Sequence, residues 1–260
     1  MTKLKQLISS IILVLFIIFS WQIAENIINA NRLANNETGL EAFIPSPATI
    51  VHTFVESGSL IINQSVYTFS KAIIGFGIGV LFAILVAFIF LLAPWLRNIT
   101  LPILFGINSF PIVGLAPAIV LAFGQGSFFS IIFISALICY FPTLITLDTA
   151  FNNVDKDVLD LMHVMNASKW QVTRYVRLPQ ALPYLFLAMK LAIPGSIIGA
   201  TMGEWLGARN GLGQLITVAL YQLKPGLLYA SLFLIVAVSI LGILIIEFLE
   251  RYFVKWKYLK

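Results

Sequence analysis

The sequence predicts an all-α protein that crosses a lipid bilayer several times. Hydrophobic residues make up 60% of the 260 positions and charged residues only 10%, and the mean hydropathy is +0.97. A chain this apolar cannot hide its side chains in one water-soluble core, so the bilayer must be the solvent for most of it. The apolar runs are continuous blocks rather than the alternating ten-residue segments of a β-barrel, so the spans are predicted to be helices.

A membrane-spanning helix needs about 20 mostly apolar residues. The sequence contains six such runs, near residues 7–27, 72–93, 102–123, 128–149, 184–203 and 229–249. All six belong to a single domain over residues 1–260. The first run follows Lys3 and Lys5 as a signal peptide would, but it continues through Ile28 without a small-residue cleavage pattern, so we expect a retained helix.

The third run is interrupted by Pro102, Pro111 and Pro117 and by Gly106 and Gly114. Proline removes a backbone hydrogen bond and kinks a helix. Irregular backbone is tolerated in a membrane only where protein or a water-filled path surrounds it. This span is therefore predicted to be kinked and to face the protein interior.

The distribution of Lys and Arg predicts the orientation in the membrane. With a cytoplasmic N-terminus, eleven of these residues fall inside and four outside, with Lys190 within a span. The inner residues are Lys3, Lys5, Arg97, Lys156, Lys169, Arg174, Arg177, Arg251, Lys255, Lys257 and Lys260, and the outer ones are Arg32, Lys71, Arg209 and Lys224. Both termini and the loop 150–183 are thus expected in the cytoplasm, and the loop 29–65 outside, with a short surface helix after Pro47. The asymmetry and attraction to anionic lipid explain the net charge of +5, without a nucleic-acid partner.

The cytoplasmic loop contains a polar segment that reads DLMHVMNASKWQVTRYVRLPQALP. Apolar residues from Val158 to Met165 recur at i, i+3, i+4 and i+7, and Asp157 and Asp160 take the other side. This spacing predicts a short amphipathic helix.

A second helix is predicted to follow it. Ser168 and Gln171 fit a capping box, and Asn166 stands where the first helix must end in the left-handed conformation. The second helix is expected to end before Pro179, and Pro183 to begin the fifth span. Spacing alone leaves open whether this bracket binds a partner or only packs against the protein's own helix ends.

The segment resembles the EAA loop of bacterial ABC importer permeases, whose pattern is E-A-A, three residues, G, nine residues and I-x-L-P. Asp160 stands at the Glu position, Asn166 at the Gly and Val176 at the Ile, and Leu178 and Pro179 match directly. Leu161 and Met162 take the places of the two alanines. In that family the loop is a coupling helix that sits in a groove of the ATPase. The resemblance assigns this role to Asp160, Met162, Asn166, Ala167, Ser168, Trp170, Val176, Leu178 and Pro179.

Further blocks resemble the nitrate/sulfonate/taurine branch of the family, which also holds thiamine-precursor and riboflavin permeases. They are IPSPATI, SKAIIGFGIGV, FPIVGLAPAIVLAFGQG, NASKWQ and GEWLGARNGLG. The resemblance implies a type I importer permease with six transmembrane helices in the bacterial cytoplasmic membrane. The implied partners are a second permease copy, a cytoplasmic ABC ATPase dimer and an extracytoplasmic substrate-binding protein. ATP and Mg would be bound by the ATPase, and this chain would hold no cofactor.

Buried polar residues in membrane spans tend to face an internal cavity. This rule nominates Asn108, Ser109, Ser135, Thr143, Ser196, Thr201 and Glu204 for the translocation path. The serines and threonines could instead bond their own helices, and Glu204 could gate, contact the binding protein or pair with Arg209. Sulfonate, taurine, nitrate and a vitamin precursor all remain open as substrates; the lack of Arg or His in this set slightly favours a neutral or aromatic solute.

A membrane-embedded enzyme, or a carrier without an ATPase partner, is the alternative class. No G-x-x-x-x-G-K-[ST] phosphate loop occurs, and Gly75 and Gly79 fit close helix packing better than ligand binding. The only histidines are His52 and His163, the only cysteine is Cys139, and there is no H-E-x-x-H motif. No catalytic residue and no metal site are therefore predicted.

Overall fold

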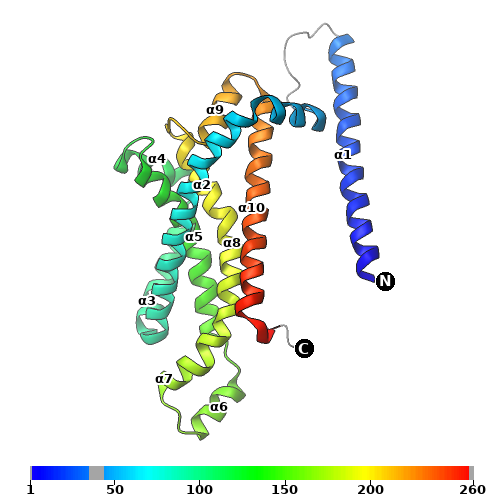
Figure 1. Cartoon of the computed structure of the whole chain (residues 1–260). Helices are drawn as coiled ribbons and strands as arrows, with labels where there is room; N and C mark the ends of the chain where they lie inside the picture. The colour runs from blue at the N-terminus through cyan, green and yellow to red at the C-terminus, as the bar shows by residue number, and fades with distance from the viewer. Residues whose placement is uncertain (1, 35–43, 258–260) are drawn as a thin grey trace.

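A computed structural model describes residues 2–34 and 44–257, and all regular structure in these ranges is helical (Figure 1). The elements are α1 (Thr2–Ala34), α2 (Pro47–Leu92), α3 (Pro94–Asn108), α4 (Ile112–Phe123), α5 (Phe128–Asn152), α6 (Lys156–Val164), α7 (Lys169–Val172), the π-helical turn η1 (Thr173–Arg177), α8 (Leu178–Trp205), α9 (Leu212–Tyr221), α10 (Pro225–Phe253) and the 3-10 turn η2 (Lys255–Lys257). The all-α prediction is confirmed.

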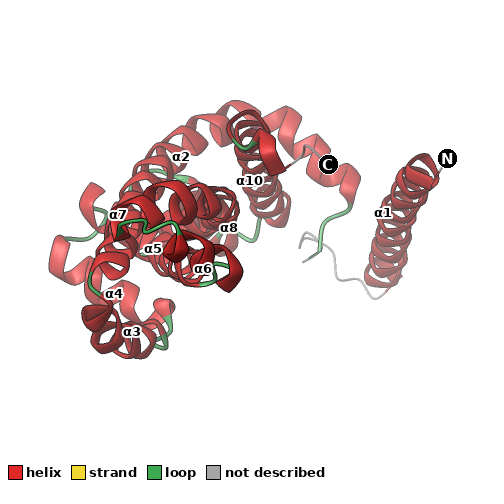
Figure 2. Ribbon diagram, turned by 90° about the horizontal axis from the view of Figure 1, so that it is seen from below, coloured by secondary structure: helices red, strands yellow, loops and turns green. Residues whose placement is uncertain are grey.

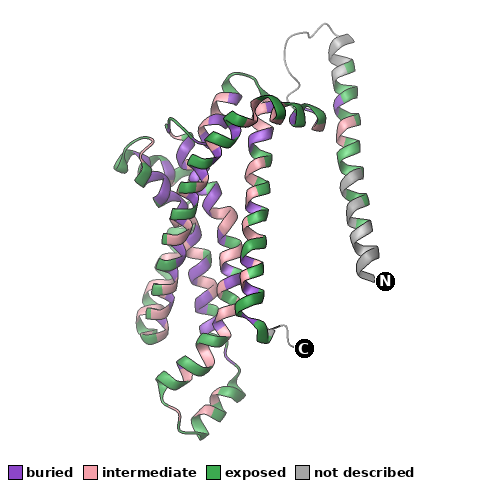
Figure 3. Ribbon diagram, viewed as in Figure 1, coloured by how far each residue is buried: buried purple, intermediate pink, exposed green. Residues whose placement is uncertain are grey.

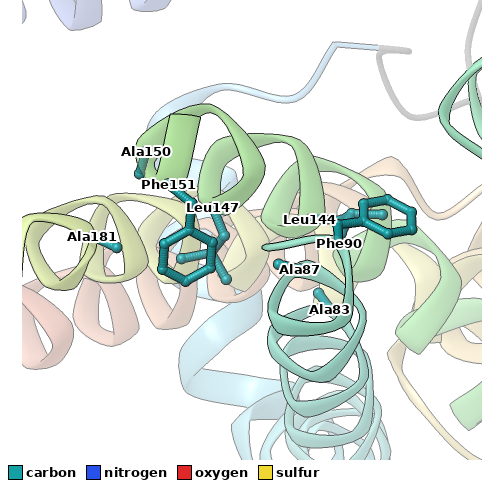
Figure 4. Close-up of a cluster of buried hydrophobic side chains, with 8 residues drawn as sticks. All are labelled: Ala83, Ala87, Phe90, Leu144, Leu147, Ala150, Phe151 and Ala181. Carbon is teal, nitrogen blue, oxygen red and sulfur yellow. The ribbon is translucent and has the colours of Figure 1, made fainter. Parts of the chain in front are cut away.

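Small residues let α2, α5 and α8 pack closely at the centre. A Cβ atom added at Gly79 would lie 2.5 Å from the carbonyl oxygen of Ala136, and one at Gly75 would overlap Ser135. From α8, a Cβ at Gly199 would lie 2.7 Å from the Cα of Ser135. The expected packing role of Gly75 and Gly79 is confirmed. Toward the C-terminal ends of α2 and α5, leucines and phenylalanines pack among alanines, and Ala83, Ala87, Phe90, Leu144, Leu147, Ala150, Phe151 and Ala181 form one cluster (Figure 4).

Within the described residues, four helical segments are long and apolar enough to cross a membrane, or five if a bent pair counts as one span. The four are 47–92, 128–152, 169–205 and 225–253, and they contain four of the predicted spans. Their outward faces stay exposed along the bundle (Figure 3), for example at Leu81 and Phe248, as a bilayer environment requires. The predicted span 7–27 lies in α1, whose described apolar part, Phe16–Ile28, is shorter than a span.

The loop predicted over residues 29–65 is wrong from Pro47 onward. A helix does begin there, with the Ser46 hydroxyl accepting a hydrogen bond from the Thr49 N–H, but it continues unbroken for 46 residues. Buried contacts explain the continuity, because Ile61 packs with Leu212 in one core cluster. The first turns of α2 cross the end of α10 (Figure 1), and residues 35–43 lie outside the described part of the chain.

The third predicted span is two helices rather than one kinked rod. α3 and α4 meet at an angle of 94°. The break falls at Pro111, which has φ −63° and ψ 120° and caps α4. Proline has no N–H and disfavours the helical region at the residue before it, so a sharp break replaces the expected kink. Pro102 and Pro117, by contrast, lie within α3 and α4.

The second loop helix does not end before Pro179, and Pro183 does not begin a span, because α7, η1 and α8 are continuous from 169 to 205. Leu178 is helical, with φ −66° and ψ −47°, and its N–H bonds to the carbonyl of Thr173 five residues back. A proline ring normally clashes with the carbonyl four residues earlier, here Tyr175. The π turn breaks the regular ladder at that carbonyl and so accommodates the ring.

Candidate coupling loop and buried polar pairs

The polar segment forms a bracket of two short helices, α6 and α7, that projects beyond the ends of α5 and α8 (Figure 1). Seen from below, α6 and α7 lie in front of α5 and α8 (Figure 2). Asn166 has φ 54°, and the N–H of Ala167 bonds back to the carbonyl of Met162 at 3.0 Å. The Ser168 N–H donates to Gln171 Oε1 at 2.7 Å, and the Gln171 N–H donates to Ser168 Oγ at 3.3 Å. The predicted left-handed turn and capping box are both confirmed.

The bracket is fixed at both ends. Asp155 caps α6 by accepting the Asp157 N–H at 3.0 Å. The side chain of Gln180, at the start of α8, donates to the carbonyl of Asn153, at the end of α5, at 2.9 Å. α7 runs into α8 through helical turns, so no flexible linker separates the bracket from α8.

The predicted coupling residues all lie on this bracket or on the first turn of α8. Met162, Ala167 and Val176 are partly buried, and Asp160, Asn166, Ser168, Trp170, Leu178 and Pro179 are exposed. Val164 is a further apolar residue of the bracket that the prediction did not include, and it is 83% exposed. In the sequence it is a valine between His163 and Met165, outside the main apolar stripe of α6.

Glu204 occupies the centre of a buried polar cluster at the end of α8. Its carboxylate accepts hydrogen bonds from the Thr68 hydroxyl at 2.7 Å, from Lys71 Nζ at 3.1 Å and from the Gly213 N–H at 3.0 Å. The side chain of Glu204 is fully buried, and that of Lys71 is 12% exposed. The alternative pairing with Arg209 is wrong, because the partner in the structure is Lys71 of α2. This cluster therefore ties α2, α8 and the start of α9 together.

The glycines of GEWLGARNGLG make room for this carboxylate. Gly211 has φ 124°, and a Cβ atom there would overlap the Glu204 carboxylate. The N–H of Gly211 donates to Gln64 Oε1 at 2.6 Å, and the N–H of Leu212 donates to the Thr68 hydroxyl at 2.7 Å. The first backbone donors of α9 are thus satisfied by side chains of α2 and α8.

Two further ion pairs were not predicted. Arg97 of α3 donates two hydrogen bonds to Asp148 of α5, at 2.6 and 2.8 Å. Lys190 of α8 donates to Glu250 of α10 at 2.5 Å. The carboxylate of each pair is almost completely buried. An acidic residue inside an apolar run was the available signal, but a single sequence does not identify its partner.

Four of the predicted path residues lie in the packed interior of α5 and α8. They are Ser135, Thr143, Ser196 and Thr201, all buried. The Ser135 hydroxyl donates to the carbonyl of Ser196 across the helix contact at 2.9 Å, and the other three hydroxyls donate to carbonyls of their own helix. These bonds match the alternative in which the hydroxyls serve helix structure, and the path role of the four stays a prediction.

The other two path candidates, Asn108 and Ser109, are exposed at the break between α3 and α4. They line a cavity of about 420 Å³ that also contacts α5. Aromatic side chains from both sides contribute to its wall, namely Phe110, Tyr140 and Phe141, and no charged residue does. We call this the elbow cavity. The structure thus separates the seven candidates into two at a cavity and five in packed or ion-paired positions.

The chain is similar in sequence to permease proteins of known transport systems. The model of the "binding-protein-dependent transport system inner membrane component" family matches residues 79–257. The riboflavin transport system permease protein RibX of Chloroflexus aurantiacus is 30% identical over 223 residues, covering 85% of this chain and 83% of RibX. The formylaminopyrimidine transport permease protein ThiX of Halalkalibacterium halodurans is 28% identical, covering 84% and 88%.

The putative aliphatic sulfonates permease SsuC of Bacillus subtilis is 27% identical, covering 82% of this chain and 78% of SsuC. Among solved structures, an inward-facing conformation of the MetNI methionine ABC transporter matches with a TM-score of 0.57 and 19% identity, covering 72% of this chain and 95% of the matched one. That likeness supports the fold. The family match favours a transporter over the membrane-enzyme alternative, since these proteins are non-enzymatic permeases. The chain belongs to the binding-protein-dependent transport system inner membrane components, the multi-pass permease subunits of ABC importers.

Proposed function

We propose that this permease works as a homodimer whose brackets 156–179 transmit the ATPase cycle to the membrane helices. The observation that carries the proposal is the continuous helix from 169 to 205, which joins the bracket directly to a membrane span. Exposed apolar side chains, including Leu161, Met165 and Trp170, project from the bracket. An apolar helix face inserted into a groove is a common recognition mode.

The cycle follows from this geometry. Closure of an ATPase dimer, which would hold ATP and Mg, would displace the bracket, and α8 would move with it. The Gln180–Asn153 hydrogen bond would carry α5 along, because it joins the two helix ends. Binding energy at the bracket then needs only to shift the balance between inward-open and outward-open states.

The proposed topology has six membrane spans and cytoplasmic termini. The four long spans, the bent pair α3–α4 and α1 would make up the six. The excess of Lys and Arg around the bracket and near the C-terminus supports this orientation. The same topology places the Glu204 cluster near the outer surface, where an extracytoplasmic binding protein would dock.

The elbow cavity is the proposed part of the translocation path, with Asn108 and Ser109 as its polar contacts. Its volume of about 420 Å³ suits a small organic solute. Its aromatic, uncharged lining supports a planar neutral solute, such as riboflavin or a thiamine pyrimidine precursor, over a sulfonate. An anion would need a cationic or hydrogen-bond-rich partner that this lining does not supply.

Coexpression with the cognate ATPase and binding protein tests the coupling role. Asp160→Lys and Trp170→Ala are expected to reduce ATPase copurification and ATP-driven uptake together. Trp256→Ala is the matched control, because Trp256 is comparably exposed but lies in η2, outside the bracket. Normal copurification and uptake in both bracket variants would overturn the coupling role.

Uptake into proteoliposomes tests the substrate class. Riboflavin, formylaminopyrimidine and ethanesulfonate are compared, with Phe110→Ala in the elbow cavity and Phe129→Ala as a control outside its lining. We expect uptake of one of the heteroaromatic solutes, reduced in Phe110→Ala and retained in Phe129→Ala. Uptake of ethanesulfonate alone would contradict the substrate class without affecting the coupling proposal.

A further inference from the structure

A second cavity lies between the bracket and the junction of α2 and α3. Its volume is about 410 Å³. One wall is apolar and comes from the ends of the membrane helices, at Leu91, Leu92 and Pro94, and the opposite wall comes from α6, α7 and η1. Figure 1 shows this junction at the end of the bundle that faces α7. We call it the junction cavity.

The bracket side of the junction cavity is basic. Lys169 and Arg177 line it together with His163, and no carboxylate is among its lining residues. Across the described part of the chain, no ion pair joins Lys169 or Arg177 to an acidic side chain. The cavity therefore presents two cations without a protein counter-charge beside an apolar wall.

Neighbouring aromatic residues indicate where the junction cavity lies relative to the membrane surface. Trp95 follows Pro94 directly and is 67% exposed, and Tyr175 in η1 is also 67% exposed. Trp and Tyr are enriched where a membrane meets water, because their rings combine an apolar body with a polar group. The cavity thus lies where lipid headgroups would be.

We propose that the junction cavity binds the phosphate headgroup of an anionic phospholipid. Arg177 and Lys169 would contact the phosphate oxygens, and the upper acyl segment would lie against Leu91 and Leu92. The inference rests on the proposed orientation, since the cytoplasmic leaflet carries the anionic lipids that attract juxtamembrane cations. A bound lipid would connect the coupling bracket to the membrane surface.

A carboxylate of the docked ATPase is the competing counter-charge for the same cations. The wall formed by Leu91 and Leu92 favours the lipid, because an acidic side chain gains nothing from an apolar surface at the membrane ends of α2 and α3. A free phosphate ion would likewise leave that wall unused.

Native mass spectrometry of the purified full-length chain tests the proposal. The chain is released from detergent in the presence of equal amounts of phosphatidylglycerol and phosphatidylcholine. Wild type is expected to retain phosphatidylglycerol preferentially. The double variant Lys169→Gln, Arg177→Gln should lose retention by about fivefold for each cation removed. Arg174→Gln is the matched control, because it removes an exposed cation of the same π turn that does not line the cavity.

The charge-conserving double variant Lys169→Arg, Arg177→Lys should keep the preference for phosphatidylglycerol. If the double Gln variant does not purify, the single variants Lys169→Gln and Arg177→Gln replace it. Equal retention of both lipids by wild type, or equal loss in Arg174→Gln, would overturn the site. Displacement of phosphatidylglycerol by millimolar inorganic phosphate would show a free-anion site and overturn the lipid assignment. Normal lipid retention with lost ATPase copurification in the Gln variants would assign the cations to the ATPase instead. None of these measurements depends on transport.

Discussion

Asp148 of α5 holds Arg97 of α3 through two hydrogen bonds, at 2.6 and 2.8 Å, about one turn before the end of α5. Asn152 adds a donor to the same carboxylate at 3.1 Å. The pair joins the base of α3, whose other end forms the elbow cavity, to the helix that leads into the bracket. It is therefore a direct mechanical link between the two proposed functional regions.

The exposures of the two side chains predict an asymmetric response to substitution. Arg97→Gln leaves the Asp148 charge, whose side chain is 6% exposed, without its cation, and should destabilise the protein by about 3 kcal/mol. Asp148→Asn leaves Arg97, which is 32% exposed and can reach water, and should cost about 1 kcal/mol. Thermal unfolding in detergent measures the stability loss of each variant. The double variant should be more stable than Arg97→Gln alone, and the reverse order would contradict the buried-charge explanation.

Features that depend on a few neighbouring residues could be predicted from the sequence. The turn at Asn166, the capping box at Ser168 and the helix start at Pro47 all follow from local backbone chemistry. Features that depend on contacts between residues far apart in the sequence, or on irregular helical turns, could not be predicted. The continuity of α2 depends on contacts with α9, and the passage of α8 through Pro179 depends on a π turn that has no simple sequence signature.

The polar pairs show the same division. Glu204 was recognised as unusual, but its partner Lys71 lies 133 residues away, and Arg97 lies 51 residues from Asp148. Neither partner can be assigned without the packing of α2, α3, α5 and α8. The charge count, by contrast, predicts an orientation in the membrane without requiring any pairing.

Glu204 should be far more sensitive to loss of charge than an exposed acid. Glu204→Gln leaves Lys71, 12% exposed, without its counter-charge and should cost on the order of 3 kcal/mol. Glu56→Gln is the control, because Glu56 is 64% exposed and pairs only with His52, so it should cost under about 1 kcal/mol. Thermal unfolding in detergent again compares them. Equal small shifts in the two variants would mean that the buried cluster contributes little to stability.

Two glycines on α2 should respond oppositely to alanine. Gly79→Ala would place a Cβ atom 2.5 Å from the Ala136 carbonyl oxygen, so α2 and α5 must separate, at a cost of about 1–3 kcal/mol. Gly77→Ala meets nothing within 4 Å and should be neutral, or stabilising by up to about 1 kcal/mol through helix propensity. Midpoints of thermal unfolding for the two variants, prepared in the same detergent, test this difference. A destabilised Gly77→Ala would instead reveal a contact with another subunit at that face.

The turn at Asn166 predicts a difference between substitutions that share a loss of the amide group. Asn166→Gly keeps access to φ 54° and restores the glycine of the family pattern, so bracket geometry and ATP-driven uptake should be retained. Asn166→Val forces a β-branched residue into the left-handed region, at a cost of about 2 kcal/mol, and the turn should relax to another conformation. Uptake and ATPase copurification should then fall together while the thermal stability of the membrane helices changes little. If Asn166→Gly lost uptake as completely as Asn166→Val, the bracket would require the amide side chain rather than the backbone conformation.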